Sequence, residues 1–440
     1  MKAISECRAC QSKNLVEFLD LGRQYLADFR RDKLRPPKYP LVGVFCEDCK
    51  LVQLKHSTPQ PEMYHERYGF KSGISDSIKA DLDDIVTHAF QYNNDPMNWL
   101  DIASNDGTLL SFVPNDVFRM GVDPVGFLCK EAEQHADSIL NEYFGETTIP
   151  LKFDVITSIS CFYDMPDPNK FVKDVKAVLG EHGVWIIQQN YLLSTMNINA
   201  VDNFCHEHLE YYTLLSLENL LEKHGLAVNE VYLSDINGGS IRTVVSHKGS
   251  FPVDASVRQQ RMIEYDTGLG KIEAYREFAD NVGKELVKLN RLVNQLKSEG
   301  KTIAILAAST RGATIWQSAG IDSKQISYAV ERNPAKVGAR FSSIDVPIVS
   351  EEVFRTMRPD YAIIGPWFFK DEIIDREVAY LLAGGKLINP LPKVEIYEHT
   401  SYPTADLQAA WFTPACSWQH QGYYQELLHS VLRCWEWGRS

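Results

Sequence analysis

The sequence predicts an α/β protein in which a small cysteine-bearing module is followed by two Rossmann-like units. Four of the nine cysteines form two Cys-x-x-Cys pairs, at Cys7/Cys10 and Cys46/Cys49. Two apolar strands, 99–102 and 302–306, each enter a turn of small residues that opens into a helix. A chain of 440 residues is long enough for two or three domains with separate cores.

Composition and charge exclude several classes of partner. The hydrophobic fraction of 44% and charged fraction of 23% are those of an ordinary globular protein. A net charge of −13, without a cluster of Lys and Arg, argues against nucleic acid and anionic membranes as partners. The N-terminus lacks a signal-peptide core, and no apolar run reaches about eighteen residues. We therefore expect a cytoplasmic protein, in which nine cysteines do not form a disulfide framework.

The two cysteine pairs predict a structural zinc site. Cys-x-x-Cys turns present sulfur ligands with the geometry of a tetrahedral site, and the set Cys7, Cys10, Cys46 and Cys49 supplies four. A closed four-cysteine site leaves the metal no open position, so its contribution is folding energy. The alternatives are a redox pair or coincidence.

The segment after this module contains an aromatic loop and a helix. Residues 64–73 carry tyrosines and glycines, and residues 74–90 have the apolar spacing of one helix. The loop fits a lid over a pocket and a linker that covers the next domain equally well.

The turn that follows the strand at 99–102 has the pattern of a cofactor cradle. Asp101 closes the strand, and about twenty residues later Asp123 ends a second strand and is placed to hold a ribose. The turn lacks the first two glycines of a pyrophosphate-binding loop, so S-adenosylmethionine (SAM), which has no phosphate, fits better than NAD. The alternative is a purely structural loop. The predicted cofactor-binding residues are Asp101, Ala103, Ser104, Asn105, Asp106, Gly107, Asp123 and Gln188.

The core domain reads as alternating strands and helices. We expect strands at 99–102, 121–123, 153–158 and 184–188, and a helix at 168–179 that begins with a proline. The short segment between residues 123 and 153 predicts a missing or compressed strand. Alternation implies a mainly parallel sheet, which gathers at one edge the polar residues that end its strands: Asp101, Asp123, Ser158, Ser160, Gln188 and Asn190.

The motif His206-Glu207-His208 is the predicted site of chemistry. An imidazole beside a carboxylate suits general acid–base catalysis at neutral pH. The spacing is not His-Glu-x-x-His, so a zinc-protease site is excluded. The sequence also offers no third metal ligand, which argues against a catalytic metal. The competing interpretation is a pair of structural histidines.

A helix from Thr213, ended by Gly225, and a strand lead to a glycine pair that ends at Arg242. Adjacent glycines let backbone amides approach a ligand, and an arginine fork suits a phosphate or a carboxylate. The alternative is a plain hairpin turn.

The C-terminal half predicts the second Rossmann-like unit. An apolar stripe over 282–296 indicates a long core or interdomain helix, which leads into the strand at 302–306. Ser309, Thr310 and Arg311 then open a helix, where a phosphate or simple capping is expected. A strand at 326–331 ends in Glu331, as the first unit's second strand ends in an acid.

Taken in order, these motifs resemble the sugar C-methyltransferases. The order is Cys-x-x-Cys twice, Ser104-Asn-Asp-Gly107, His206-Glu-His208, Gly238-Gly-Ser-x-Arg242, Ser309-Thr-Arg-Gly312, Glu331-Arg-Asn-Pro-x-Lys336 and Gly385-Lys-Leu-Ile-x-Pro-Leu-Pro392, over about residues 5–397. The resemblance implies a zinc-binding module at 1–60, a class I SAM-dependent methyltransferase domain at 61–250, a Rossmann-like substrate domain at 251–400 and an unassigned tail at 401–440.

The resemblance also implies a mechanism and a small-molecule nucleotide-sugar substrate. His208 matches the family's base, which removes a proton from the carbon next to a sugar ketone, and Glu207 orients it. Tyr68 and His206 are candidates for the partner of the resulting oxyanion. The residues expected to bind the substrate are Asn237, Gly239, Ser240, Arg242, Ser309, Thr310, Arg311, Glu331, Asn333 and Lys336.

Three departures from the family pattern point to a changed acceptor pocket. Ala103 replaces a usual glycine, Cys205 a frequent tyrosine, and Asp164 a common histidine. We favour a SAM-dependent C-methyltransferase acting on a nucleotide-linked keto-sugar. The other two hypotheses are a methyltransferase for another acceptor or for oxygen, and a binding protein without catalysis. A peripheral helix is expected at 423–434 in the tail.

Overall fold

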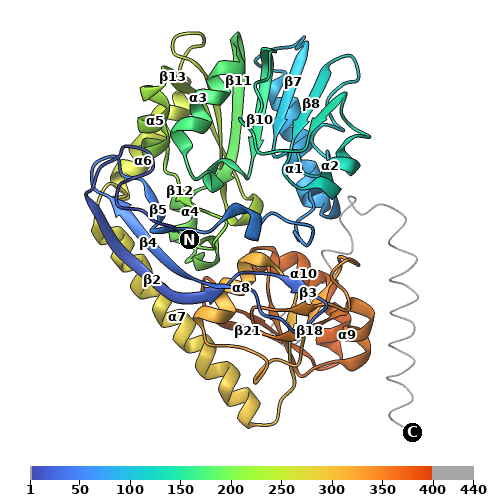
Figure 1. The fold of residues 1–440 in the computed structure, drawn as a ribbon. Helices are drawn as coiled ribbons and strands as arrows, with labels where there is room; N and C mark the ends of the chain where they lie inside the picture. The colour runs from blue at the N-terminus through green and yellow to red at the C-terminus, as the bar shows by residue number, and fades with distance from the viewer. Residues whose placement is uncertain (1, 399–440) are drawn as a thin grey trace, which may run out of the picture.

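A computed structural model describes residues 2–398 of the chain (Figure 1), so the predicted tail and its helix lie outside the described residues. Three bodies of structure follow one another. In Figure 1 the N-terminal strands, in blue, lie between a green and cyan unit above and an orange unit below. None of the described helices is long and apolar enough to cross a membrane.

The N-terminal module is built on a four-stranded antiparallel sheet of order β12-β5-β4-β2. Its strands β2 (Leu15–Tyr25), β4 (Lys38–Cys46) and β5 (Val52–Leu54) come from the module itself. The fourth, β12 (Glu210–Tyr211), comes from much later in the chain. β1 (Lys2–Ala3) and β6 (His56–Ser57) pair separately, and η1 (Gln60–Glu62) leads out of the module.

The middle unit is a seven-stranded sheet of order β13-β14-β11-β10-β7-β8-β9. β7, which comes first in the sequence among the strands of this sheet, lies inside the sheet, and β14 is antiparallel to both of its neighbours. This is the strand order of class I methyltransferases. The strands are β7 (Asn98–Ile102), β8 (Phe118–Val122), β9 (Ser138–Leu140), β10 (Phe153–Ile159), β11 (Leu179–Asn190), β13 (Leu226–Ser234) and β14 (Ser240–His247).

The helices of this unit follow the predicted pattern. Ser75 accepts a hydrogen bond from the Ile78 N–H and begins the 14-residue α1, and Asp167 caps α3 ahead of a proline. The unit's helices are η2 (Ser72–Ile74), α1 (Asp76–Ala89), α2 (Gly126–Ala132), η3 (Phe162–Asp164), α3 (Pro168–Val178), α4 (Leu192–Asn197), η4 (Val201–Asn203), α5 (Leu214–Lys223) and η5 (Ile236–Gly238).

The expected compression between residues 123 and 153 is confirmed. α2 occupies seven residues and β9 only three, yet β9 still pairs in parallel with β8. The strand is therefore present but short. The sheet keeps its full order with less chain than the pattern usually takes.

The C-terminal unit is an eight-stranded sheet of order β21-β20-β19-β15-β16-β18-β17-β3. Five central strands are parallel, as the predicted Rossmann-like pattern requires. The strands are β15 (Ile303–Leu306), β16 (Tyr328–Glu331), β17 (Arg340–Phe341), β18 (Val346–Ser350), β19 (Tyr361–Ile364), β20 (Lys386–Asn389) and β21 (Glu395–Tyr397). The helices are α8 (Thr310–Ser318), α9 (Glu351–Met357), η6 (Trp367–Phe369), α10 (Lys370–Arg376) and α11 (Val378–Leu382).

The last strand of that order, β3 (Phe29–Arg30), belongs to the N-terminal module. The module therefore takes one strand from the middle unit and gives one to the C-terminal unit. α6 (Ala255–Asp266) and the 27-residue α7 (Ile272–Ser298) connect the two larger units, and α7 runs beside β2 and β4 (Figure 1). The boundaries at residues 60, 250 and 400 stay predictions, because two of the three larger sheets draw strands from across them.

Candidate active site

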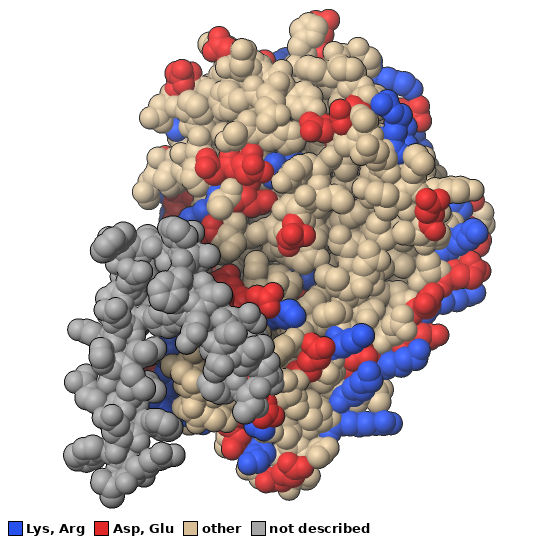
Figure 2. Space-filling view, turned by 180° about the vertical axis from the view of Figure 1, so that it is seen from behind, with Lys and Arg blue, Asp and Glu red and all other residues tan. Residues whose placement is uncertain are grey.

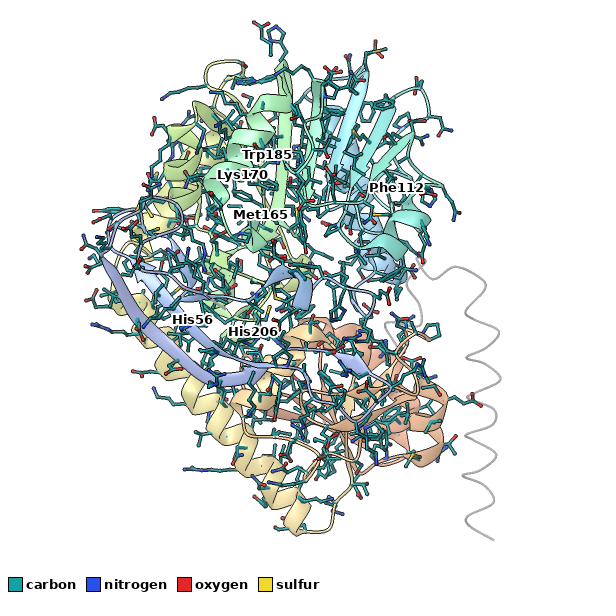
Figure 3. All side chains as sticks on the ribbon, viewed as in Figure 1. His56, Phe112, Met165, Lys170, Trp185 and His206 are labelled. Carbon is teal, nitrogen blue, oxygen red and sulfur yellow. The ribbon has the colours of Figure 1, made fainter. Side chains whose placement is uncertain are left out.

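A cavity of about 390 Å³ opens at the carboxyl ends of β7, β8 and β10. This is the edge at which ligands bind in open parallel sheets, and the volume is that of a small-molecule site. The turns after the three strands form its floor, through Ala103, Asp123 and Ser160. Met165, shortly before α3, and Lys170, in its first turn, line one side (Figure 3).

The predicted cofactor turn has an unusual backbone that its hydrogen bonds hold in place. Ala103 and Asn105 have φ of 60° and 52°, the left-handed region that costs a residue with a Cβ about 1 kcal/mol or more. The Ala103 N–H donates to the Val122 carbonyl at 2.8 Å, and the Asn105 N–H donates to the Asp123 carboxylate at 3.0 Å. The alanine methyl is therefore accommodated, and both residues line the cavity.

Asp123 directly follows β8, with its carboxylate fixed at the cavity wall. Oδ2 accepts from the Asn105 N–H and Oδ1 from the Val125 N–H, at 3.0 and 2.8 Å. Burial raises the pKa of Asp123, and these two bonds act against that rise. A carboxylate held in this way is suited to accept from the hydroxyls of a ribose.

Two residues of the turn, Asp106 and Gly107, serve the fold and do not line either cavity. A Cβ at Gly107, whose φ is +79°, would lie 2.8 Å from the Ala132 backbone, so this glycine permits close packing of α2. Asp106 accepts from the Gly73 N–H at 2.9 Å and from the Thr108 hydroxyl at 2.6 Å. The prediction that Gly107 lets a ligand approach the backbone is corrected, because α2 occupies that space.

A smaller cavity of about 40 Å³ adjoins the main one, and Asp101, Ser104 and Gln188 line it. Asp101 accepts from the Thr157 hydroxyl at 2.7 Å, and burial raises its pKa to about 7. Both polar atoms of the Gln188 amide have partners, because Nε2 donates to Asp81 at 2.5 Å and Oε1 accepts from Arg242 at 2.8 Å. Gln188 therefore supports the wall of this cavity through other side chains.

The charges around the main cavity fit SAM. One basic residue, Lys170, lines it, and its Nζ is paired with Asp174 at 2.6 Å. A cationic sulfonium is favoured among carboxylates, whereas a pyrophosphate is not. The acidic residues that line the cavity are Asp123, Glu142, Glu146, Asp164, Asp167 and Asp174.

The aromatic loop at 64–73 covers this cavity. Tyr64, Tyr68 and Phe70 all line it, and the rings of Tyr64 and Tyr68 lie 5.5 Å apart. The loop also packs on the C-terminal unit, because a Cβ at Gly69 would meet Phe29 and Lys336 within 3 Å. Of the two interpretations left open by the sequence, the arrangement matches the lid.

His208 has one tautomer favoured by its surroundings. Its Nδ1 lies 2.9 Å from the Asn203 carbonyl, which only accepts, so Nδ1 carries the proton and Nε2 keeps a free lone pair. Burial and the charge of Arg311 lower the pKa of His208 to about 3, so the ring is neutral at pH 7. The ring does not line the cavity and packs on Tyr163, with centroids 4.4 Å apart.

The other two residues of the motif face different ways. The His206 Nε2 lies 3.2 Å from the carbonyl of Tyr39 on β4, and Figure 3 shows this histidine beside the N-terminal strands, below Met165. Burial lowers the pKa of His206 to about 4. Burial also raises the pKa of Glu207, whose charge acts on Tyr64 and Tyr68. The orientation of His208 expected from Glu207 comes instead from the Asn203 carbonyl.

The prediction that Arg242 binds a phosphate or a carboxylate of the substrate is wrong, because its guanidinium is engaged by side chains inside the fold. It donates to Gln188 and to Asp84 at 2.8 Å each and lies 3.6 Å from Asp81. The glycine pair before it forms the hairpin between β13 and β14, the alternative that the sequence left open. A Cβ at Gly239 would lie 2.4 Å from Ser194.

Two residues of this hairpin have other partners. The Ser240 hydroxyl donates to the Ile236 carbonyl, while Asn237 lines the smaller cavity. The backbone carbonyl of Asn237 accepts from Arg311 at 2.9 Å. The hairpin is thereby joined to the C-terminal unit.

The residues predicted in the C-terminal unit gather at the carboxyl ends of β15 and β16. Ser309 caps α8 by accepting from the Gly312 N–H at 3.0 Å, and Thr310 is the first residue of that helix. Arg311 pairs with Asp202 at 2.8 Å, so its charge ties the unit to η4. These contacts show the capping role, and a phosphate role stays a prediction.

The acidic end of β16 repeats the pattern of Asp123. Glu331 accepts from the N–H groups of Arg332 and Asn333 at 2.8 and 3.1 Å. Lys336 lies 3.4 Å from Glu331 and donates to the Ala308 carbonyl at 3.0 Å. Burial lowers the pKa of Lys336, and its Nζ lies 4.1 Å from the centre of the Phe29 ring.

Several residues at the site were missed by the sequence analysis. Asp81 and Asp84 of α1 neutralise Arg242, and Tyr64 donates to Asp164 at 2.9 Å. Asp81 and Asp84 lie on the polar face of an amphipathic helix, which gives no signal of a partner. Asp164 departs from the family pattern, and that departure was the available signal.

The four cysteines converge as predicted. Their Sγ atoms all lie within 4.8 Å of one another, and tetrahedral zinc with Zn–S bonds of about 2.3 Å places sulfurs about 3.8 Å apart. Both pairs form the same turn: the N–H of the residue after the second cysteine donates to the carbonyl of the first. These residues, Gln11 and Lys50, have φ of 63° and 66°. The donor set and the geometry fit a structural zinc ion, distant in role from the cavity.

Charge on the surface is mixed. On the face shown in Figure 2, basic side chains lie among acidic ones and form no continuous basic patch. This agrees with the expectation from a net charge of −13.

Comparison with protein families gives three matches in consecutive order. Residues 7–64 match the model described as "Putative zinc binding domain", residues 76–231 match "Methyltransferase domain", and residues 235–392 match "C-methyltransferase C-terminal domain". Together they span the described zinc module, the seven-stranded sheet and most of the C-terminal unit.

Among curated proteins, the chain is 27% identical over 419 residues to the C-methyltransferase NovU of Streptomyces niveus, covering 90% of this chain and 97% of NovU. It is 28% identical over 134 residues to a tRNA U34 carboxymethyltransferase of Campylobacter jejuni, 29% of this chain and 44% of that protein. A SAM-dependent methyltransferase structure from Clostridium acetobutylicum matches 40% of this chain and 94% of its own, with 18% identity and a TM-score of 0.33.

The three domain matches agree with the strand order and the cysteine cluster described above. SAM is the cofactor, and zinc is the structural metal. The chain is therefore a SAM-dependent methyltransferase that joins a zinc-binding module, a class I methyltransferase domain and a C-methyltransferase C-terminal domain.

Proposed function

We propose that the protein transfers a methyl group from SAM to the carbon next to the ketone of a nucleotide-linked keto-sugar, with His208 as general base. Similarity to NovU over nearly its whole length is the observation that carries the proposal of C-methylation. The keto-sugar acceptor rests on the motifs that resemble the sugar C-methyltransferases.

The main cavity is the proposed SAM site, and the acceptor carbon is proposed to lie between the methyl of SAM and His208, which is outside the cavity lining. Asp123 would hold the ribose of SAM, and the turn from Ala103 to Asn105 would support the rest of the molecule. Bound SAM supplies an electrophilic methyl on a sulfonium, whose charge the surrounding carboxylates favour. Because methyl transfer needs little covalent help, alignment of the acceptor carbon with that methyl supplies much of the rate.

The protein's own part is to make the acceptor carbon nucleophilic. The free Nε2 of His208 accepts the proton from the carbon next to the ketone, and the electron pair of the C–H bond forms an enolate. A bond then forms between that carbon and the methyl as the C–S bond breaks. The carbonyl is restored, S-adenosylhomocysteine leaves, and the proton stays on His208 until it passes to solvent.

The nucleotide is proposed to lie toward the C-terminal unit. Thr310 and Glu331 stand at the carboxyl ends of β15 and β16, and Lys336, which lies 3.4 Å from Glu331, packs against Gly69 of the aromatic loop. The acidic lining of the main cavity disfavours a diphosphate there, which supports a nucleotide position outside the cavity. Buried Lys336 is the nearby cation that would face it.

Turnover with matched acceptors tests this function. The enzyme is incubated with SAM carrying a 13C methyl and a panel of nucleoside-diphosphate keto-sugars, each paired with its reduced counterpart. We expect NMR of the product to show the label bonded to carbon, with no reaction of the reduced sugars. A label on oxygen, or equal use of reduced sugars, contradicts the proposal.

The base assignment has its own test. His208→Ala should abolish turnover and leave the Kd for SAM, measured by titration calorimetry, nearly unchanged, because the ring does not line the cavity. His206→Ala is the matched variant, since this ring is held by Tyr39, away from the cavity. Unchanged turnover of the His208 variant rejects the assignment.

A further inference from the structure

Among the described residues, Asp164 is the one cavity-lining carboxyl with a buried oxygen that has no hydrogen-bond partner. Asp164 is 9% exposed. It is the last residue of η3, which follows the turn after β10. Tyr64 donates to Oδ2 at 2.9 Å, while Oδ1 is buried and has no partner. Leaving a buried carboxyl oxygen unpaired costs free energy, so the site is completed by a ligand that pairs with it.

The surroundings of Asp164 carry negative charge and little solvent. Burial raises the pKa of Asp164 well above its usual range, and the charges of Glu207 and Glu210 add to this rise. The hydrogen bond from Tyr64 acts in the opposite direction but does not cancel it. This direction favours the protonated, neutral form of the carboxyl. The other groups that feel its charge are Tyr68, Tyr163, Tyr211, Cys161 and Cys205.

The contact with Tyr64 decides which oxygen carries the proton. Because Oδ2 accepts from the Tyr64 hydroxyl, Oδ1 is the oxygen left to carry an acid proton and to donate it. We propose that Asp164 donates this hydrogen bond to the ketone oxygen of the acceptor and stabilises the enolate formed there. The inference rests on the proposed C-methylation, and it fills a role for which the sequence offered Tyr68 and His206.

Geometry favours Asp164 over one of those two candidates. His206 is turned to the Tyr39 carbonyl, so its Nε2–H is already used, whereas Asp164 and Tyr68 both line the cavity. A neutral acid can hold an enolate without adding charge, as a protonated aspartate beside a tyrosine does in ketosteroid isomerase. Asp164 and Tyr68 would then address the oxyanion together, and Tyr64 would fix the acid's orientation.

The variants Asp164→Asn and Asp164→Ala test whether residue 164 acts as a hydrogen-bond donor or as a base. With S-adenosylhomocysteine in place of SAM, the wild type should exchange the hydrogen next to the ketone of a nucleoside-diphosphate keto-sugar for deuterium from D2O. Asp164→Ala should slow this exchange and methyl transfer together by about 100-fold or more, the usual effect of losing one oxyanion donor. Asp164→Asn keeps an N–H donor and should stay within about tenfold of the wild type. Equal inactivity of both variants, or exchange unaffected in both, overturns the proposal.

A second measurement needs no acceptor. Infrared difference spectra of wild type minus Asp164→Asn, recorded on the ligand-free protein at pH 7, should show the C=O stretch of a protonated carboxyl. A carboxylate band in its place overturns the proposal. If the wild type exchanges and methylates none of the keto-sugars, the proposed function fails, and this band still decides the state of Asp164.

Discussion

At the scale of single residues, His208 is governed by the one hydrogen bond of its ring. The Asn203 carbonyl fixes the proton on Nδ1, and the buried position keeps the imidazole uncharged. The free Nε2 is thus ready to accept a proton without first losing one. The low pKa also makes the ring a weak base, which is why the mechanism needs a donor at the ketone oxygen.

We predict that His208 stays neutral from about pH 5 to about pH 8 in the free enzyme, because its pKa is lowered to about 3. The 15N shifts of its ring, identified by comparison with His208→Asn, should report a proton on Nδ1 throughout this range. Titration of the ring near the ordinary histidine pKa of about 6.5 would contradict the prediction.

Asp123 gives a second prediction at this scale. Replacing Asp123 by Ala removes the proposed acceptor for ribose hydroxyls, and each hydrogen bond to a charged group contributes about 1.5–3 kcal/mol. We expect the Kd for SAM to rise by about 10- to 100-fold in titration calorimetry. Asp83→Ala, an exposed carboxylate on α1, is the control and should bind as the wild type does. Equal affinity of both variants would remove Asp123 from the cofactor site.

Asp101 links a buried carboxyl to stability. Its pKa rises from 3.8 unfolded to about 7 folded, so between these values the folded state binds more protons. The free energy of unfolding contributed by this group therefore falls as the pH rises from about 4 to about 7, by about 4 kcal/mol. Asp101→Asn removes the titrating group, so the stability of this variant does not fall in the same way as the pH rises. Urea unfolding at pH 5 and pH 8 should show that the free energy of unfolding of the variant, relative to that of the wild type, is higher at pH 8. A difference between the two proteins that does not change with pH contradicts the prediction.

At the scale of elements, the zinc turns support the loop that carries the histidines. Cys46 ends β4 and Cys49 precedes β5, and β5 pairs with β12, which begins two residues after His208. The metal is remote from the chemistry, yet it stabilises the strand against which the catalytic motif is anchored.

Cys49→Ser should therefore lower zinc content, Tm and turnover together. Structural zinc contributes about 10 kcal/mol or more to folding in small zinc-binding peptides, so the loss should be large. Zinc is measured by mass spectrometry of the metal and Tm by scanning calorimetry. Cys129→Ser, a buried thiol of α2, should keep the wild-type zinc content. A stable, active Cys49→Ser protein without zinc is the contradictory result.

The elements most open to prediction were those with long patterns. Residues 168–179 were expected as a helix, and α3 spans Pro168–Val178, because a capping aspartate, a proline and apolar spacing agree. The two-residue strands β3 and β12 were not expected, since a pair of residues has no period to read. Arg242 was misjudged for a related reason: Asp81 and Asp84, its partners on α1, lie more than 150 residues away in sequence.

At the scale of the molecule, the three domains are coupled by ion pairs as well as by strands. Arg311 of α8 binds the buried Asp202 of η4 and the Asn237 carbonyl of the hairpin before β14. The side chain of Asp202 is 1% exposed, so its charge depends on this one arginine.

Arg311→Ala should destabilise the protein by about 3–5 kcal/mol, because it leaves a buried carboxylate uncompensated. Adding Asp202→Asn to that variant should restore part of the loss, since the unpaired charge is then gone. The free energy of unfolding of the two single variants and the double variant forms a cycle. Additive effects would show that the pair does not couple the domains.

The candidate site could be predicted in its parts more readily than in its assembly. Asp101, Asp123 and the cysteines were found because strand ends and short spacings are local signals. The open oxygen of Asp164 depends on Tyr64, one hundred residues earlier in the chain, and on burial by several elements. Such a property exists only once the domains have packed.

The placement of β3 in the C-terminal sheet has a consequence for how the chain is made. Phe29 and Arg30 leave the ribosome about 310 residues before β17, the strand with which they pair. During translation the cysteine turns can capture their metal early, but this edge must wait until Arg340 and Phe341 have been made. Pairing of β3 is thus tied to synthesis of the C-terminal unit. A nascent chain stalled before residue 340 cannot pair Phe29 and Arg30 with β17.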